Sequence, residues 1–223
     1  MPKYTTEFIG TFFLVLTVGC TGIATGPGVI PPLAIGAVLM VMIYAGGHVS
    51  GAHYNPAVTL GVFLRGRLPA ADVAPYWAAQ LAGGLAAAAI VQFFRISPPP
   101  GAPFVARVGA GFAAEFLFTF ALVYVVLNAA TADGTSGNSF YGLAIGMTVL
   151  TGAFAVGDIS GGAFNPAVAI GISVMGISNW NNIWIYLAAD FGAAVVAAMV
   201  FNMINPPAQM EPIPTAEPPY KTP

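Results

Sequence analysis

Charged residues are scarce in this sequence. Lys and Arg together number six, Asp and Glu number eight, and charged residues make up 6% of the 223 positions. Soluble domains carry about 25% charged residues, so this chain has too little charge to cover a water-facing surface. The few basic residues also argue against a nucleic-acid partner. Because 57% of the residues are hydrophobic, the composition predicts a protein whose main solvent is the lipid bilayer.

Cysteine and histidine are also scarce. The single Cys20 excludes an internal disulfide framework. His48 and His53, the only histidines, leave too few ligands for a metal site. No nucleophile, base and orienting group fall at matching depths in the chain. We therefore expect no metal, no cofactor and no enzymatic activity.

Apolar windows long enough to cross a bilayer, which takes roughly 20 residues, occur six times. They lie at about 5–25, 31–48, 71–95, 105–129, 139–157 and 182–204. The first window leads into further spanning patterns, so it is interpreted as a membrane helix and not as a cleaved signal. The last stretch, 205–223, is rich in proline and is expected to be an extended or disordered tail.

A twelve-residue motif occurs twice, as SGAHYNPAVTLG at 50–61 and as SGGAFNPAVAIG at 160–171. In each copy, Asn before Pro is typical of a helix N-cap followed by the first helical residue. The helices expected at 55–64 and 165–175 are too short to cross a bilayer. Non-helical backbone at membrane depth is tolerated only where it is buried in protein or lines a watery cavity. The motif therefore predicts two half-helices beside a pore, each begun by one Asn-Pro-Ala triplet: Asn55, Pro56 and Ala57, and Asn165, Pro166 and Ala167.

The repeat extends beyond this motif. TEFIGTFFLV at 6–15 matches AEFLFTFALV at 114–123, and Gln80 aligns with Asp190. Each half then holds three spans and one half-helix, so the second half is inverted relative to the first. We expect an all-α membrane protein made of two repeats, 1–104 and 105–204. The distribution of Lys and Arg favours both termini in the cytoplasm.

The two asparagines suggest how such a pore treats its solutes. Each side-chain oxygen can cap its helix while the amide NH₂ turns toward the lumen, so Asn55 and Asn165 become two donors facing one molecule. Each half-helix also carries about half a positive charge at its N-terminus. We expect this arrangement to repel cations.

Together, the paired Asn-Pro-Ala motifs after Ser-Gly, the Glu-Phe pairs near the start of spans one and four, and the six spans in two halves resemble the aquaporin (major intrinsic protein) family, over residues 5 to 204. The resemblance implies one pore per subunit, a homotetramer, and passive passage of water or small uncharged solutes. It also implies that Glu7 and Glu115 brace the re-entrant loops. We expect a multi-pass protein of the bacterial type in the cell (inner) membrane.

The resemblance also locates four filter positions, where this sequence departs from the water-selective members. Those carry an arginine three residues after the second Asn, and here that position is Val168. The other positions are Ile35, Gly162 and Ala153 or its neighbour Gly152. Without an arginine the opening is expected to be wider and more apolar. Glycerol, urea or metalloid acids such as arsenite are then the expected solutes, by analogy with bacterial members that lack the arginine and are associated with arsenic.

Two other classes of protein stay open at this point. A secondary transporter also uses inverted repeats and broken helices, but it needs ligands for a coupling ion. The central ionisable candidates for that role are Glu7, Glu115 and Asp190, and we expect Asp190 to be a packed, hydrogen-bonded interior group. A membrane scaffold that has lost conduction is the second alternative.

Overall fold

The computed structural model describes residues 1–22, 30–94 and 102–206. The expected proline-rich tail lies outside the described residues, apart from its first two positions. The α-helices are α1 (Pro2–Gly22), α2 (Ile30–Ser50), α3 (Pro56–Leu64), α4 (Ala70–Phe94), α5 (Val108–Val126), α6 (Tyr141–Ser160), α7 (Pro166–Val174) and α8 (Ile183–Ile204). A π-helical turn, η1 (Leu127–Thr131), extends α5, and two 3₁₀ turns, η2 (Asp133–Thr135) and η3 (Trp180–Asn182), precede α6 and α8.

Within the described part of the chain, six helical segments are long and apolar enough to cross a membrane. They confirm the expected all-α membrane fold with six spans, although several bounds differ by a few residues. The first span begins at Pro2, and the fourth continues through η1 to Thr131. The short helices α3 and α7 begin one residue after the expected starts at 55 and 165, because each Asn is a cap outside its helix.

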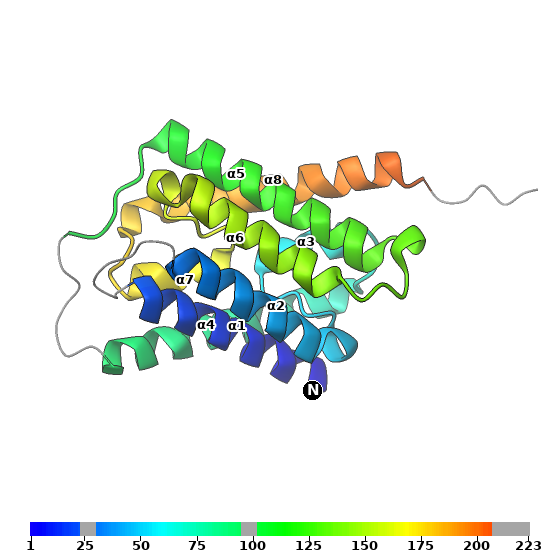
Figure 1. Cartoon of the computed structure of the whole chain (residues 1–223), viewed down its shortest axis with the longest axis horizontal. Helices are drawn as coiled ribbons and strands as arrows, with labels where there is room; N and C mark the ends of the chain where they lie inside the picture. Colours follow the sequence, from blue (N-terminus) through cyan, green and yellow to red (C-terminus); the bar gives the residue numbers. More distant parts are fainter. Residues whose placement is uncertain (23–29, 95–101, 207–223) are drawn as a thin grey trace, which may run out of the picture.

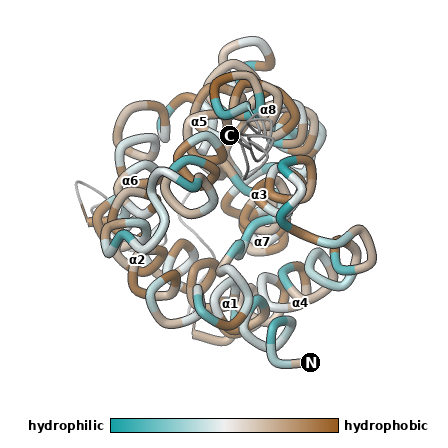
Figure 2. Tube along the Cα trace, turned by 90° about the vertical axis from the view of Figure 1, so that its right-hand side faces the viewer, coloured by the Kyte–Doolittle hydropathy of each residue, from teal (hydrophilic) through white to brown (hydrophobic). Residues whose placement is uncertain are grey.

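The long helices run side by side along the long axis of the molecule (Figure 1). The first residues of α1 and the last residues of α8 lie at the same end of this axis (Figure 1). Seen end on, the long helices surround α3 and α7 (Figure 2). Each short helix packs against the third span of both halves, because α3 contacts α4 and α8 and α7 contacts the same two helices. The boundary between the expected repeats, at 104 and 105, stays a prediction.

Glycine allows the two halves to meet closely where α2 crosses α6. Gly36 and Gly146 occupy corresponding positions, 110 residues apart, on these two helices. A Cβ atom on Gly36 would lie 2.8 Å from the Gly146 carbonyl oxygen, and one on Gly146 would lie 2.6 Å from the Gly36 carbonyl oxygen. Small residues let membrane helices approach at such distances. The crossing therefore fixes how the second and fifth spans face the interior.

The outer surface is apolar. Large hydrophobic side chains are exposed along the spans, including Leu117 (61% exposed), Trp184 (52%) and Met199 (66%). Water would make such a surface unfavourable, whereas lipid tails or another membrane protein would cover it at little cost. The polar side chains that matter for function are instead found inside the bundle.

Candidate functional site

Both short helices begin at a capped Asn-Pro step. The Asn55 side-chain oxygen accepts hydrogen bonds from the backbone N–H groups of Ala57 (2.8 Å) and Val58 (3.4 Å). The Asn165 oxygen accepts one from the N–H of Ala167 (2.9 Å). These oxygens pair N–H groups that the first turn of a helix leaves without a partner. The amide NH₂ groups of both asparagines then remain available for other contacts.

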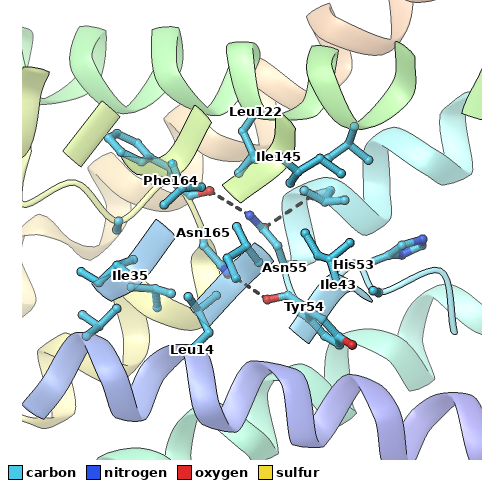
Figure 3. A pocket seen from close by; sticks show the side chains of 18 of the residues that line it. Leu14, Ile35, Ile43, His53, Tyr54, Asn55, Leu122, Ile145, Phe164 and Asn165 are labelled. Carbon is cyan, nitrogen blue, oxygen red and sulfur yellow. Dashed lines mark hydrogen bonds between the residues drawn. The ribbon is translucent and has the colours of Figure 1, made fainter. Parts of the chain in front are cut away.

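One N–H of each amide ties the two re-entrant loops together. Asn55 Nδ2 donates to the carbonyl oxygen of Phe164 (2.8 Å), and Asn165 Nδ2 donates to that of Tyr54 (2.9 Å). Figure 3 shows both bonds, with the two asparagines side by side in the middle of a cavity. The sequence motif predicted that the whole NH₂ group faces the lumen and did not reveal this contact. Since an amide has two N–H donors, each asparagine keeps one for a solute.

Glu7, from α1, holds the first re-entrant loop. Its carboxylate accepts hydrogen bonds from the backbone N–H groups of His53 (2.9 Å) and Tyr54 (2.7 Å), and from the hydroxyl of Ser50 (2.7 Å). Gln80 from α4 donates to the same carboxylate (2.8 Å). Glu7 is fully buried, and these donors offset the cost of removing its carboxylate from water.

Glu115, from α5, has the corresponding place in the second half. It accepts hydrogen bonds from Ala163 N–H (3.1 Å), Phe164 N–H (2.7 Å) and the hydroxyl of Ser160 (2.5 Å). Asp190 stands where Gln80 stands in the first half, is fully buried, and accepts from the hydroxyl of a threonine (2.8 Å). The expectation that Asp190 is a hydrogen-bonded interior group is confirmed. The contacts of Glu7 and Glu115 are those that loop-bracing residues need.

The backbone of both loops is strained, which explains why they need such support. Ala52, Tyr54 and Phe164 have φ angles of 52°, 51° and 48°. Residues other than glycine rarely adopt these left-handed backbone angles. Each such residue costs about 1–3 kcal/mol and persists only where its surroundings hold the backbone in place. Glutamate bonds to the N–H groups of Tyr54 and Phe164 provide that fixation. The carbonyls of these two residues then point at the opposite asparagine.

Two tyrosines that the sequence analysis did not single out hold the starts of the loops. Tyr76 Oη donates to the carbonyl of Ser50 (2.7 Å), and Tyr186 Oη donates to that of Ser160 (2.6 Å). Both tyrosines are buried. Their numbers also differ by 110, which is the offset of the central motif. A full search for residues identical at this offset would therefore have found them.

A cavity passes the asparagine pair, and about 480 Å³ of space not filled by atoms lies in it and in its opening to solvent. Its wall takes apolar side chains from four spans and the polar groups from the two loops. The apolar part consists mainly of Leu14 and Val18 of α1, Leu39 of α2, Leu122 and Val126 of α5, and Val149 of α6.

Three of the four expected filter residues line this cavity: Ile35, Gly162 and Val168. Ala153 does not belong to its wall, but its Cα atom would lie 3.7 Å from a Cβ atom placed on Gly162. A Cβ atom on Gly152 would instead meet two phenylalanine rings at 2.7 Å. Of the two candidates in α6, Ala153 is therefore the one beside Gly162. The role of these four residues as a filter stays a prediction.

The cavity wall, as far as the described residues form it, carries no Lys, Arg, Asp or Glu side chain. Its polar side chains include Asn55, Asn165 and His53. His53 is buried, its Nδ1 atom lies 3.2 Å from the hydroxyl of Thr59, and its ring lies 5.1 Å from that of Tyr76. The described residues also contain no group of three or more His, Cys, Asp or Glu that could hold a metal ion.

Six membrane spans, two capped half-helices and a cavity running between them define a membrane channel protein. The comparison with family models agrees, because residues 1–201 match the model described as Major intrinsic protein. The chain belongs to this family, whose members are passive channels and not enzymes.

Similar proteins include several from plants. The chain is 39% identical to Aquaporin NIP1-3 of Oryza sativa subsp. japonica over 213 residues, which cover 91% of this chain and 73% of the rice protein. It is 33% identical to Nodulin-26 of Glycine max over 220 residues, covering 92% and 78% of the two chains. The X-ray structure of the aquaglyceroporin from Plasmodium falciparum has the same fold, with a TM-score of 0.75 at 22% identity over 92% of this chain and 97% of that one.

These findings make the chain a multi-pass membrane channel for water and small solutes. The two relatives from rice and soybean support a membrane protein but not the bacterial inner membrane expected from the sequence. The side on which the termini lie stays a prediction.

Proposed function

We propose that this channel passes small uncharged solutes larger than water, in addition to water itself. The observation that carries the proposal is Val168. It stands three residues after Asn165 and lines the cavity. None of the other described residues in the cavity wall is Lys, Arg, Asp or Glu. An arginine at this position would narrow the lumen and add fixed positive charge. A valine leaves the opening wider and apolar.

The other proposed filter residues act in the same direction. In the cavity wall, Gly162 contributes no side chain and Ile35 offers only hydrocarbon, and Ala153 beside Gly162 is small. Such a wall favours solutes with some apolar surface, and the free amide N–H of each asparagine supplies a hydrogen-bond donor further in. Glycerol, urea and neutral metalloid acids such as arsenous acid have this size and chemistry.

Cation rejection rests, in this proposal, on the helix termini and not on a filter arginine. Each half-helix presents about half a positive charge at its N-terminus, and the two N-termini meet at the asparagine pair. The wall around them is apolar, so the field of these termini is weakly screened. A neutral solute passes this point, whereas a cation is repelled.

Stopped-flow light scattering on vesicles that contain the purified channel tests the proposal. Shrinkage and re-swelling are followed after mixing with glycerol, urea or arsenite, and water permeability is measured with an impermeant osmolyte. We expect solute entry clearly faster than in empty vesicles and linear with concentration. Entry no faster than in empty vesicles would disprove the proposed solute class, and saturable uptake driven by an ion gradient would indicate a transporter.

We further propose that the channel forms a homotetramer and that both termini lie in the cytoplasm. The apolar outer surface described above provides area for lipid and for other copies of the chain. Lys3 lies in the first turn of α1, and Arg65 after α3 donates to the carbonyl of Thr131 at the end of the fourth span (3.4 Å). Arg107 precedes that span at its other end. This excess of cations on the face where α1 begins supports a cytoplasmic location for that face.

A further inference from the structure

Each proposed filter residue has a counterpart in the other repeat. The counterparts lie 110 positions away in the sequence. Ile35 corresponds to Ile145, Ala153 to Ile43, Gly162 to Ala52, and Val168 to Val58. We call the first four residues the Ile35 set and their counterparts the Ile43 set. All four members of the Ile43 set line the cavity. Inverted repeats place such counterparts at opposite ends of a pore, on either side of the midplane.

The structure agrees with this placement. Ile35 lies on one side of the asparagine pair, and Ile43, Ile145 and His53 lie on the other side (Figure 3). The loops that carry the two sets have the same construction, because each is held by a buried glutamate and ends at a capped asparagine with an extended backbone, φ −156° at Asn55 and −162° at Asn165. Differences in side chains therefore decide which end is narrower.

The Ile43 set is the bulkier one. Ile and Val occur in both sets, but Ile43 replaces Ala153 with three more carbon atoms, and Ala52 replaces Gly162 with one more. Exposure follows the same order. Every member of the Ile43 set is buried, with exposed fractions of 2–7%, whereas Val168 is the one buried member of the Ile35 set. The Ile35 set is therefore the less tightly packed of the two.

We propose that the Ile43 set, and not the Ile35 set, forms the narrowest part of this channel and sets the upper size of its solutes. The proposal deepens the proposed function and rests on it. In channels that keep the filter arginine, that residue makes the filter end the narrow one, whereas Val168 removes this difference from Val58. The remaining asymmetry comes from Ile43 and Ala52. A constriction made of hydrocarbon also resists ions, because it cannot replace their hydration shell.

Larger polyols test the proposal. Entry of glycerol, erythritol and ribitol is measured by stopped-flow light scattering for the unmodified channel and for Ile43→Ala and Ile145→Ala. One methylene in an apolar pocket changes discrimination roughly tenfold or more, so each variant should admit erythritol about tenfold faster. Water and glycerol entry should change less, because they already pass.

Ile35→Ala is the comparison variant, since it makes the same substitution as Ile43→Ala on the same helix, α2, at the other end of the cavity. We expect it to raise erythritol entry less than Ile43→Ala or Ile145→Ala does, because the Ile35 set is not the narrowest part. Faster entry through Ile35→Ala with no gain from Ile43→Ala and Ile145→Ala would overturn the proposal. Ile43→Val and Ile145→Val, with smaller gains, take the place of any alanine variant that does not give a single symmetric peak in gel filtration.

The same variants separate failure of this proposal from failure of the proposed function. If the unmodified channel passes water but not glycerol, the proposed solute class is wrong. A gain of glycerol entry in Ile43→Ala or Ile145→Ala, and not in Ile35→Ala, would then still support the Ile43 set as the narrowest part. Equal behaviour of all three variants would overturn it.

Discussion

The two repeats are alike at the asparagine pair and differ behind the loops. Facing the cavity, each has a capped asparagine and a carbonyl that accepts from the other asparagine. Behind the first loop, Gln80 donates to both Glu7 (2.8 Å) and Thr59 (2.9 Å), so a neutral amide meets a carboxylate. Behind the second loop, Asp190 takes the place of the amide.

The second arrangement has fewer hydrogen bonds than the first, in which Gln80 donates twice although its Oε1 atom has no partner among the described residues. Asp190 Oδ1 accepts from Thr119, but among the described residues Oδ2 has no hydrogen-bond partner. Asp190 also interacts electrostatically with Glu115, a second buried carboxyl group. From this difference we infer that the pore requires the same asparagine and the same loop conformation in both halves. The residues behind the loops can differ as long as the loop N–H groups remain paired. The predictions below test this division.

The largest effect is expected from removing the glutamates. Glu7→Leu would leave four hydrogen-bond donors without their acceptor, and Glu115→Leu would leave three. Each buried donor that loses its partner costs about 1–3 kcal/mol. Both variants should therefore give much less folded protein, with Glu7→Leu the worse of the two. The yield of monodisperse protein in mild detergent, together with the midpoint of thermal unfolding, measures this.

Glu7→Gln and Glu115→Gln serve as controls, because an amide oxygen still accepts from the loop. They should retain more folded protein than the leucine variants. A Glu115→Leu variant as stable as the unmodified channel would contradict the bracing role, since the strained backbone at Phe164 would then hold its conformation unaided.

Removing the asparagine side chains is expected to lower stability less than removing the glutamates, and by a similar amount in the two halves. Asn55→Ala and Asn165→Ala each remove a helix cap, which costs about 1 kcal/mol, and a cross-loop hydrogen bond of similar size. Because Asn55 caps two N–H groups and Asn165 caps one, Asn55→Ala should have the slightly lower unfolding midpoint. A much lower unfolding midpoint for one variant alone would contradict the expectation that the two asparagines stabilise their loops to a similar extent.

Val168→Arg changes one end of the cavity and should affect permeation more than stability. The arginine narrows the filter end, and an added barrier of about 1.4 kcal/mol would lower glycerol entry about tenfold. Water entry should fall less, because water is smaller and bonds well to a guanidinium. Stopped-flow measurements of both solutes on one vesicle preparation give the ratio. Equal reductions of water and glycerol would contradict the argument from size.

The sequence predicted the fold and the two helix starts well, because that information is local and doubled. An Asn-Pro step before an apolar run specifies a capped helix by itself, and its second copy excludes coincidence. The start of each short helix therefore shifted by one residue only. The span ends were less certain, since apolar composition continues into turns such as Leu127–Thr131.

The contacts between the loops depend on packing that spacing does not reveal. The choice between Gly152 and Ala153 needed the rings of Phe118 and Phe164, which occupy the space beside Gly152. The bonds from each asparagine to the opposite carbonyl need the positive φ angles at Tyr54 and Phe164, and no local preference of Tyr or Phe favours such angles. Alignment of the two repeats at an offset of 110 did match Gln80 with Asp190, but it did not predict the hydrogen-bond partners of either residue.

The smallest effect is expected from Asp190→Asn, which makes the second repeat more like the first. The amide keeps an oxygen that can accept from Thr119 and replaces the unpaired Oδ2 with an N–H group that can donate, as Gln80 donates to Glu7 in the first half. One added hydrogen bond and the loss of a nearby like charge should stabilise the protein by about 1 kcal/mol. The midpoint of thermal unfolding should rise, and glycerol entry should stay the same because Asp190 does not line the cavity.

Gln80→Glu is the reciprocal variant and should lower the midpoint, since it would place a second carboxyl group against Glu7. An unchanged or lower midpoint for Asp190→Asn would contradict the argument in an informative way. It would mean that Asp190 already carries a proton and donates its O–H to Glu115, so that an amide offers no new donor. The carboxyl group of Asp190 would then donate as the amide of Gln80 does, and the two repeats would differ in their chemistry but not in the stability that they give to the loops.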